Sequence, residues 1–165
     1  MTMTYALHRI FCSTPGDLES ERQAFHDVIG EVNEAEGVRR NVLFAPVSIV
    51  PLMMNKLFYQ PAVDANIREC KFFVQVLQHT WGPPEKNCES DYHLACRLQD
   101  DPGSPVEQIA LFFRTADGLE VEPGILQLKS SLQSQPGRAA YEFASLEDYK
   151  RQLRNQLSEW LRTMH

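Results

Sequence analysis

The sequence predicts a three-layer α/β fold, in which helices cover both faces of a parallel sheet. Five apolar, strand-like runs alternate with helical patterns along the chain, and right-handed crossovers between parallel strands place helices on both faces. The run 72–77 (FFVQVL) is almost continuously apolar, which is typical of a strand buried on both sides. A length of 165 residues suits one domain. We therefore predict a single domain over residues 1–165.

The first strand and the first helix are separated by a run of turn-forming residues. Strand character over 5–12 ends at the segment 13–17 (STPGD), which also favours the start of a helix. From Leu18 onward, apolar residues recur on one helical face, and acidic residues in the first turn complement the helix dipole. We predict that this helix ends at Gly37, because glycine commonly follows the last helical turn.

The second strand is predicted over 42–50, which is rich in β-branched and apolar residues. We expect an irregularity at Pro46, which has no N–H to donate, and an end at Pro51. Residues 52–59 fit neither the helical nor the strand pattern and are left unassigned.

The remaining elements follow from the same two patterns. Apolar side chains three or four residues apart predict helices, and short apolar runs predict strands. The last helix has the clearest pattern, because Ser145 begins a capping box and an apolar stripe, which we assign to the core, extends to Met164. The predicted elements are a helix over 62–70, a strand over 72–77, a helix over 90–98, a strand over 109–113, a helix over 124–132, a strand over 139–143 and a helix from 146.

A five-stranded sheet of this kind commonly has the order 2-1-3-4-5, which is the flavodoxin-like arrangement. Strands 1 and 3 then lie side by side where the winding reverses, and the loops that follow them frame a crevice. We therefore expect the functional residues in the loops 13–17 and 79–88.

Composition and missing motifs exclude several classes of function. The net charge of −6 argues against a nucleic-acid surface. No apolar stretch approaches the roughly 18 residues of a membrane span, and no leader pattern is present. Four cysteines without a C-x-x-C pair indicate reduced thiols, so we expect a cytoplasmic protein. Phosphate-loop, dinucleotide, serine-hydrolase and zinc-protease motifs are missing. Two histidines and two cysteines could form a mixed metal site, but their spacings match no zinc pattern; they are His79, Cys88, His93 and Cys96. We therefore predict neither cofactor nor metal.

The turn after the first strand is the first candidate binding site. Ser13, Thr14 and Asp17 lie where helix N–H groups point outward, so their hydroxyls and amides suit an anion such as a phosphate. The alternative is that these residues only cap the helix. Arg22 lies on the apolar side, and we expect it to reach the crevice or the Asp17 carboxylate. Glu21 is expected on a solvated face.

The turn after the third strand supplies the other candidates. Trp81 offers a flat stacking surface and Gly82 a close backbone approach, although a tryptophan here also suits a lid over the core. Glu89 and Asp91 open the next helix, where acidic residues favour the helix dipole. The alternative role is catalytic, because a carboxylate there stabilises positive charge on a ribose during glycosidic cleavage.

Two segments resemble a known family. The segment 10–22 (IFCSTPGDLESER) resembles the opening signature of domain of unknown function family 4062, in which a strand ending in V-F-[IV]-S-S-T precedes x-x-D-L-x-x-E-R. The segment 67–74 (IRECKFFV) resembles the family's I-x-x-C-D-x-[FY]-[IV], and Trp81-Gly82 its aromatic-glycine turn. The residues that agree with the opening signature in order and spacing are Ser13, Thr14, Asp17, Leu18, Glu21 and Arg22.

The resemblance implies a fold and two alternative functions. The family is similar in fold to TIR domains and usually precedes STAND-type NTPase or repeat regions in signalling and bacterial defence. We therefore expect a signalling or effector module that acts through protein partners or self-association. TIR enzymes that cleave NAD use a glutamate in the region where Asp91 stands here, so the alternative is an enzyme that binds a NAD-like nucleotide, or another nucleoside, and cleaves its glycosidic bond. The sequence leaves open whether the chain is an enzyme.

Overall fold

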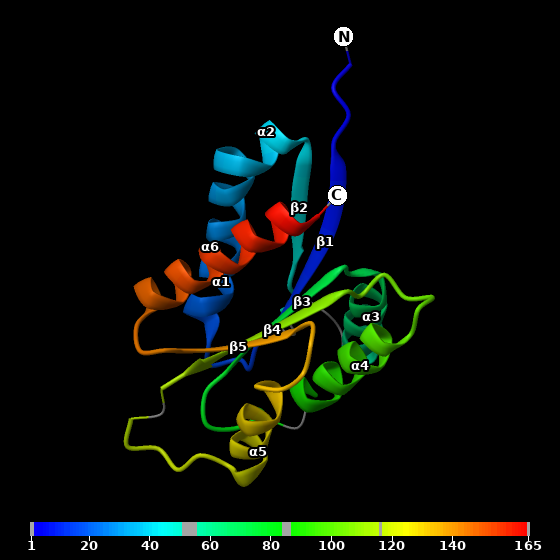
Figure 1. Cartoon of the computed structure of the whole chain (residues 1–165). Coiled ribbons are helices and arrows are strands. Elements are labelled where there is room, and N and C mark those ends of the chain that lie inside the picture. The colour runs from blue at the N-terminus through cyan, green and yellow to red at the C-terminus, as the bar shows by residue number, and fades with distance from the viewer. Residues whose placement is uncertain (1, 51–55, 84–86, 116, 165) are drawn as a thin grey trace.

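The computed structural model describes residues 2–50, 56–83, 87–115 and 117–164. Within them, strands and helices alternate along the chain (Figure 1). The elements are β1 (Ala6–Ser13), α1 (Glu19–Val32), a π-helical turn (Asn33–Gly37), α2 (Val38–Arg40), β2 (Val42–Val47), α3 (Lys56–Glu69), β3 (Phe72–Leu77), α4 (Cys88–Asp100), β4 (Gln108–Arg114), α5 (Pro123–Leu132), β5 (Arg138–Phe143) and α6 (Leu146–Thr163).

The five strands form one parallel sheet in the order β2-β1-β3-β4-β5. The predicted fold class, a flavodoxin-like three-layer α/β domain, is therefore confirmed. Ile10 of β1 pairs with Pro46 on one side and with Phe72 on the other, whereas the first half of β1 pairs with β2 alone. As a result, β1 and β2 extend beyond the rest of the sheet at their amino-terminal ends (Figure 1).

Helices cover both faces of the sheet and enclose two cores. One core lies between the sheet and α1 with α6, where the Trp160 ring stacks on Phe72 at a centroid distance of 4.5 Å. The other lies between the sheet and α3, α4 and α5, where Ile67 and Phe73 are fully buried. Alternate residues of β3 contribute to opposite cores, which explains why its sequence is apolar at every position except Gln75.

The helix that follows β1 does not end at Gly37, so that prediction is wrong. The helical backbone continues through the π-helical turn into α2. It ends at Asn41, which adopts the left-handed conformation at φ 58°. Gly37 serves packing, because a Cβ atom there would lie 2.4 Å from the carbonyl oxygen of Val42. The close approach of β2, and not a helix end, requires glycine at this position.

The other boundaries differ from prediction by smaller amounts. Strand β2 ends at Val47 and helix α4 begins at Cys88, two residues before the predicted start. Helix α3 begins at Lys56 and accommodates Pro61; the predicted stop at Pro51 lies outside the described residues. The cap of α6 is confirmed, because the Ser145 side chain accepts a hydrogen bond from the Asp148 N–H.

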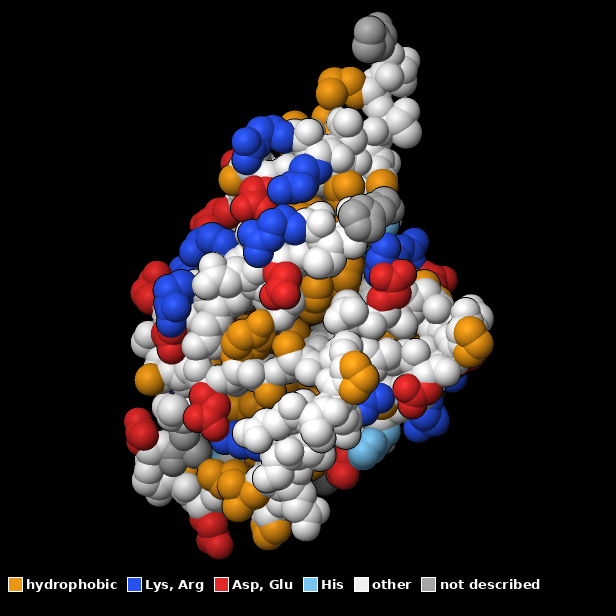
Figure 2. Space-filling view, in the orientation of Figure 1, with side chains coloured by type: hydrophobic (Ala, Val, Ile, Leu, Met, Phe, Trp, Pro, Cys, Tyr) orange, Lys and Arg blue, Asp and Glu red, His pale blue; other side chains and the backbone are white. Residues whose placement is uncertain are grey.

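The surface carries both signs of charge. On the face shown in Figure 2, Lys and Arg side chains are interspersed with Asp and Glu side chains, with small apolar areas between them. None of the described helices combines the length and the apolar character needed to cross a membrane.

Candidate functional site

The turns that follow β1 and β3 meet at the carboxyl edge of the sheet. Ser13, the last residue of β1, pairs with Gln75 of the neighbouring β3. Beyond them, Gly82 adopts φ +91°, and a Cβ atom there would lie 2.9 Å from the Cβ atom of Pro15. The two turns are therefore adjacent, as predicted, but they contact each other and leave no open crevice at this point.

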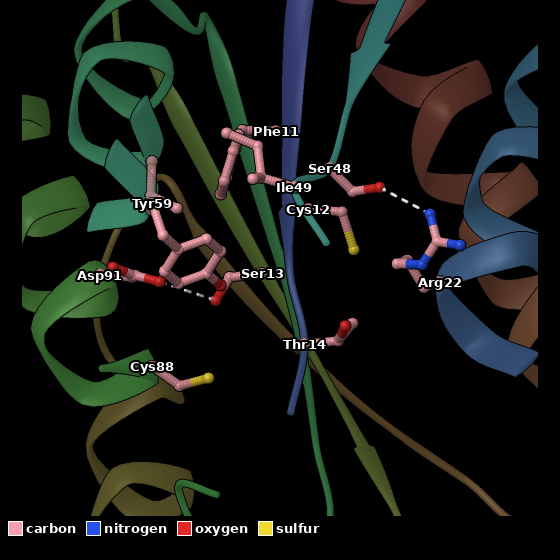
Figure 3. Close-up of a pocket in the computed structure, with 11 residues that line it drawn as sticks. Phe11, Cys12, Ser13, Thr14, Arg22, Ser48, Ile49, Tyr59, Cys88 and Asp91 are labelled. Atoms are coloured by element: carbon pink, nitrogen blue, oxygen red, sulfur yellow. Dashed lines mark hydrogen bonds between the residues drawn. The ribbon is translucent and has the colours of Figure 1, made fainter. Parts of the chain in front are cut away.

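A buried polar cluster lies behind this contact. The Ser13 hydroxyl donates to Asp91 Oδ2 at 3.2 Å (Figure 3). Gln60 Nε2 donates to Asp91 Oδ1, also at 3.2 Å. Gln75 Nε2 is within hydrogen-bond distance of Ser13 Oγ, at 3.3 Å, and donates to the backbone carbonyl of Cys88 at 2.8 Å. Ser13 is 5 %, Asp91 3 % and Gln75 0 % exposed. The cluster thus joins β1, β3, α3 and α4.

The cavity beside the cluster has a volume of about 10 Å³, which is room for about one water molecule. Its walls include Thr14, Tyr59 and the Asp91 side chain. Burial, with a smaller contribution from the Asp91 charge, raises the pKa of Tyr59 to about 12, and burial also raises the pKa of the Cys12 thiol. Neither group is therefore ionised at neutral pH, and the cavity does not admit a sugar to the Asp91 carboxylate.

Arg22 contacts residues other than those expected. Its Nε donates to the Glu19 carboxylate at 2.9 Å and its Nη1 donates to Ser48 Oγ at 3.1 Å. The expected partner Asp17 is exposed. Helix α1 has Leu18 at its N-cap position, and no described side chain caps it. The Ser13 hydroxyl, which was a candidate cap, instead donates to Asp91.

Trp81 and Glu89 belong to a different hollow. They line an open groove of about 430 Å³ between α4 and α5, together with Tyr92 and His93. The Trp81 ring lies 5.8 Å from that of Tyr92 and packs partly against the core, as a lid does. Glu89 and Asp91 are two residues apart on α4, and their side chains therefore line separate hollows. Among the described residues, no group of three metal-binding side chains is assembled, the mixed histidine and cysteine set included.

The sequence analysis missed the roles of two residues of this region. Glu21, expected on a solvated face, is 3 % exposed, and its Oε1 accepts from Arg114 Nη1 at 3.1 Å. Its position was a usable signal, because Glu21 lies between Leu18 and Phe25 on the same apolar face of α1. Gln75 interrupts an apolar strand, which is a signal of a buried amide with a specific partner, and its Nε2 does donate to the Cys88 carbonyl.

Comparison with known proteins gave structural similarity only. No protein-family model and no curated protein matches the chain. General stress protein 14 from Treponema denticola in complex with FMN has a TM-score of 0.48 and 12 % identity, over 96 % of this chain and 99 % of that one. RosB with a bound intermediate, 8-demethyl-8-formylriboflavin-5′-phosphate, has a TM-score of 0.38 and 13 % identity, over 95 % of this chain and 80 % of that one.

These comparisons correct the expected ligand. Both similar structures hold flavins and neither holds a NAD-like nucleotide, so the prediction of a NAD-like ligand is wrong and is not carried further. The cavity of about 10 Å³ beside Asp91 agrees with this correction, because it is far smaller than the roughly 300 Å³ at which ligand pockets begin. At such identity the likeness indicates the fold alone, so it assigns no flavin to this chain.

Proposed function

We propose that this chain is a TIR-like interaction module for signalling or effector action, which works through contacts of its surface and not by catalysis at Asp91. The closed cavity carries the proposal. Glycosidic cleavage needs a carboxylate that reaches the sugar, whereas Asp91 is 3 % exposed beside a space of about 10 Å³. An interaction module has no such requirement.

The residues that resemble the family's opening signature support the same proposal. Ser13 donates to Asp91 on α4, and Arg22 donates to Ser48 after β2. Both side chains therefore fasten the turn between β1 and α1 to neighbouring elements. These contacts give the signature a structural role in positioning the surface of the module.

Turnover assays on the purified chain test the catalytic alternative. The chain and its Asp91→Asn variant are incubated with a panel of nucleosides and nucleotides, and release of the free base is followed by chromatography. We expect no release by either protein. Release by the natural sequence that Asp91→Asn abolishes would contradict the proposal. Glu89→Gln is the matched control, because that carboxylate lies on the same helix but faces the open groove.

Photo-crosslinking in the cells that make the chain tests for contacts. A benzoylphenylalanine is placed at Phe58 on α3, which is 63 % exposed, or at Leu126 on α5, which is 52 % exposed. A module in regular contact with other chains gives discrete crosslinked species from one face. Absence of crosslinks from both helices, together with Asp91-dependent turnover, would replace the proposal with an enzymatic one.

A further inference from the structure

The first half of β1 has a paired strand on one side only. The Ala6 N–H donates to the carbonyl oxygen of Asn41, just before β2, at 2.9 Å. Because the backbone groups of successive strand residues point to opposite sides, those of Leu7 point away from β2. On that side, β3 pairs with β1 only from Ile10 onward in the described part of the chain. The N–H and C=O groups of Leu7 therefore lie at an open edge of the sheet.

Arg9 marks the limit of this edge. Its carbonyl accepts a hydrogen bond from the residue before β3, and its side chain pairs with Glu69, the last residue of α3. Leu7, which lies beyond this pair, is 63 % exposed, and Met3, in the segment that projects past the sheet, is also 63 % exposed (Figure 1). Unpaired backbone groups and exposed apolar side chains thus occur together in residues 2–8, which we call the open edge.

The outer side of β2, at the border of the sheet, is blocked in contrast. The Phe44 N–H donates to Asn33 Oδ1 at 2.9 Å, and Asn33 Nδ2 donates to the Phe44 carbonyl at 3.0 Å. Pro46, two residues further along the same side, has no N–H to offer. Proteins block edge strands with prolines, charged side chains or covering groups, because an unpaired strand pairs with other chains. The open edge (TMTYALH) contains no proline and no lysine.

We propose that a second copy of this chain adds to the open edge as an antiparallel strand, about a two-fold axis at Tyr5. Met3 of each copy then lies opposite Leu7 of the other, so the exposed apolar side chains cover each other. The pairing ends before Arg9, whose carbonyl already has a partner. Two identical edges that pair in this way leave none for a third copy, so the dimer is closed. The inference rests on the proposed function, because it names a partner for the interaction module.

Charge does not oppose this pairing. No residue of the open edge is Asp, Glu, Lys or Arg. Burial, followed by the positive charge of Lys71, lowers the pKa of His8, whereas Glu107 acts in the opposite direction. The net lowering favours a neutral ring at pH 7, so the net charge of −6 is carried outside the paired segment. An uncharged edge selects its partner by the match of apolar side chains along the strand, and an identical strand supplies that match.

Disulfide trapping tests the register. Partners that are not hydrogen-bonded in an antiparallel ladder have Cα atoms about 4.5 Å apart, which is within reach of a disulfide. In the proposed register Thr4 of one copy and Ala6 of the other form such a pair. Chains with Thr4→Cys and chains with Ala6→Cys are mixed and oxidised, and we expect a covalent dimer with one chain of each kind. Each variant alone is the matched control and should lose this product, because the two introduced thiols are then not opposite each other.

Sedimentation equilibrium tests the contribution of individual residues. Leu7→Lys removes two apolar contacts per dimer and should raise the dissociation constant by about 100-fold or more. Leu126→Lys makes the same change of charge at an exposed leucine of α5 and should leave the constant unchanged. Tyr5→Pro removes an N–H of the open edge from each copy and should weaken the dimer by about 10-fold or more. Thr4→Pro is its control, because the N–H lost there points to the opposite side.

Three results would overturn the dimer. They are a natural chain that stays monomeric up to about 1 mM, a dimer that Leu7→Lys and Tyr5→Pro leave intact, and an oxidised mixture without the mixed product. If the lysine or proline variants do not fold, the natural chain and the cysteine variants still decide. Failure of the proposed function gives a different result. Base release that requires Asp91 would overturn that function at any oligomeric state, whereas a monomeric chain without base release overturns only the dimer.

Discussion

Replacing Gly82 by alanine tests whether the turns after β1 and β3 close the crevice. The substitution adds a Cβ atom at a residue with φ +91°, and that atom would lie 2.9 Å from the Cβ atom of Pro15. Both the backbone conformation and the contact oppose the new methyl group. We therefore expect the free energy of unfolding to fall while the fold is retained.

The magnitude follows from two costs and one gain. A left-handed conformation costs a residue with a Cβ atom about 1–2 kcal/mol, and crowding in a packed site costs about 1–3 kcal/mol. Alanine also restricts the unfolded chain more than glycine does, which stabilises the folded state by about 0.4–1 kcal/mol. The expected net loss for Gly82→Ala is about 3 kcal/mol. Gly118 isolates the backbone cost, because it has φ +74° and its Cβ atom would meet no described atom within 4 Å. Gly118→Ala should therefore cost only about 1 kcal/mol.

Urea unfolding at pH 7.5, followed by circular dichroism, measures both variants. With a slope of about 2 kcal/mol per molar, Gly82→Ala should lower the midpoint by about 1.5 M and Gly118→Ala by about 0.5 M. Pro15→Gly removes the opposing side chain and should reduce the difference between the two alanine variants. Equal midpoints for Gly82→Ala and Gly118→Ala would refute the reasoning, because Pro15 would then not press on Gly82 and the crevice would be open.

Three further predictions concern the buried cluster, the core and His26. Asp91→Ala leaves buried donors without an acceptor and should lower the free energy of unfolding by about 1–3 kcal/mol. Its control Glu89→Ala should change that free energy by no more than about 0.5 kcal/mol. Equal urea midpoints for the two variants would contradict the buried hydrogen bonds to Asp91. Trp160→Ala should lower the free energy of unfolding by about 3–5 kcal/mol, because Trp160 is only 4 % exposed. Leu126→Ala, at an exposed residue, should lower it by about 0.5 kcal/mol or less. Equal melting temperatures of the two variants in calorimetry would refute this prediction. Because the pKa of His26 in the folded chain is lowered below 6.5, the unfolded chain binds more protons as the pH falls through 6.5, so acidification should destabilise the natural chain more than His26→Gln. A titration of His26 by nuclear magnetic resonance with a midpoint at or above 6.5 would show that the sign is wrong.

The sheet was predictable from sequence because burial on both faces leaves a direct pattern. Strand β3 has the predicted bounds, since each of its side chains enters one of two cores and every position but Gln75 is apolar. The start of α6 could also be predicted from local sequence, because the Ser145 cap depends only on residues of the same turn. Gly37 shows the opposite case. The residue that requires glycine there is Val42, and sequence spacing does not reveal that its carbonyl oxygen approaches so closely.

The candidate site was predicted in its location and only partly in its chemistry. The adjacency of β1 and β3 brings Ser13 near α4, as strand order alone implies. Which of the two acidic residues of α4 faces that strand depends on helix rotation. Asp91 is buried on the same face of α4 as Cys88, three residues before it, and Ala95, four residues after it, and this spacing was a readable signal. The partner of Glu21, Arg114, is 93 residues away along the chain, so no local sequence pattern predicts this pair.

The contacts at the end of β1 give its polar residues a structural role at a place with no open pocket. Ser13 reaches α4 on one side of the sheet, while Arg22, one turn into α1, reaches Ser48 after β2. Each contact fixes the β1–α1 turn to a different neighbour, and Pro15 against Gly82 adds a third. Because buried polar groups cost free energy unless they are satisfied, these side chains are constrained by one another and tolerate little change. Such a constraint accounts for these residue types without any substrate, so their presence alone is weak support for catalysis.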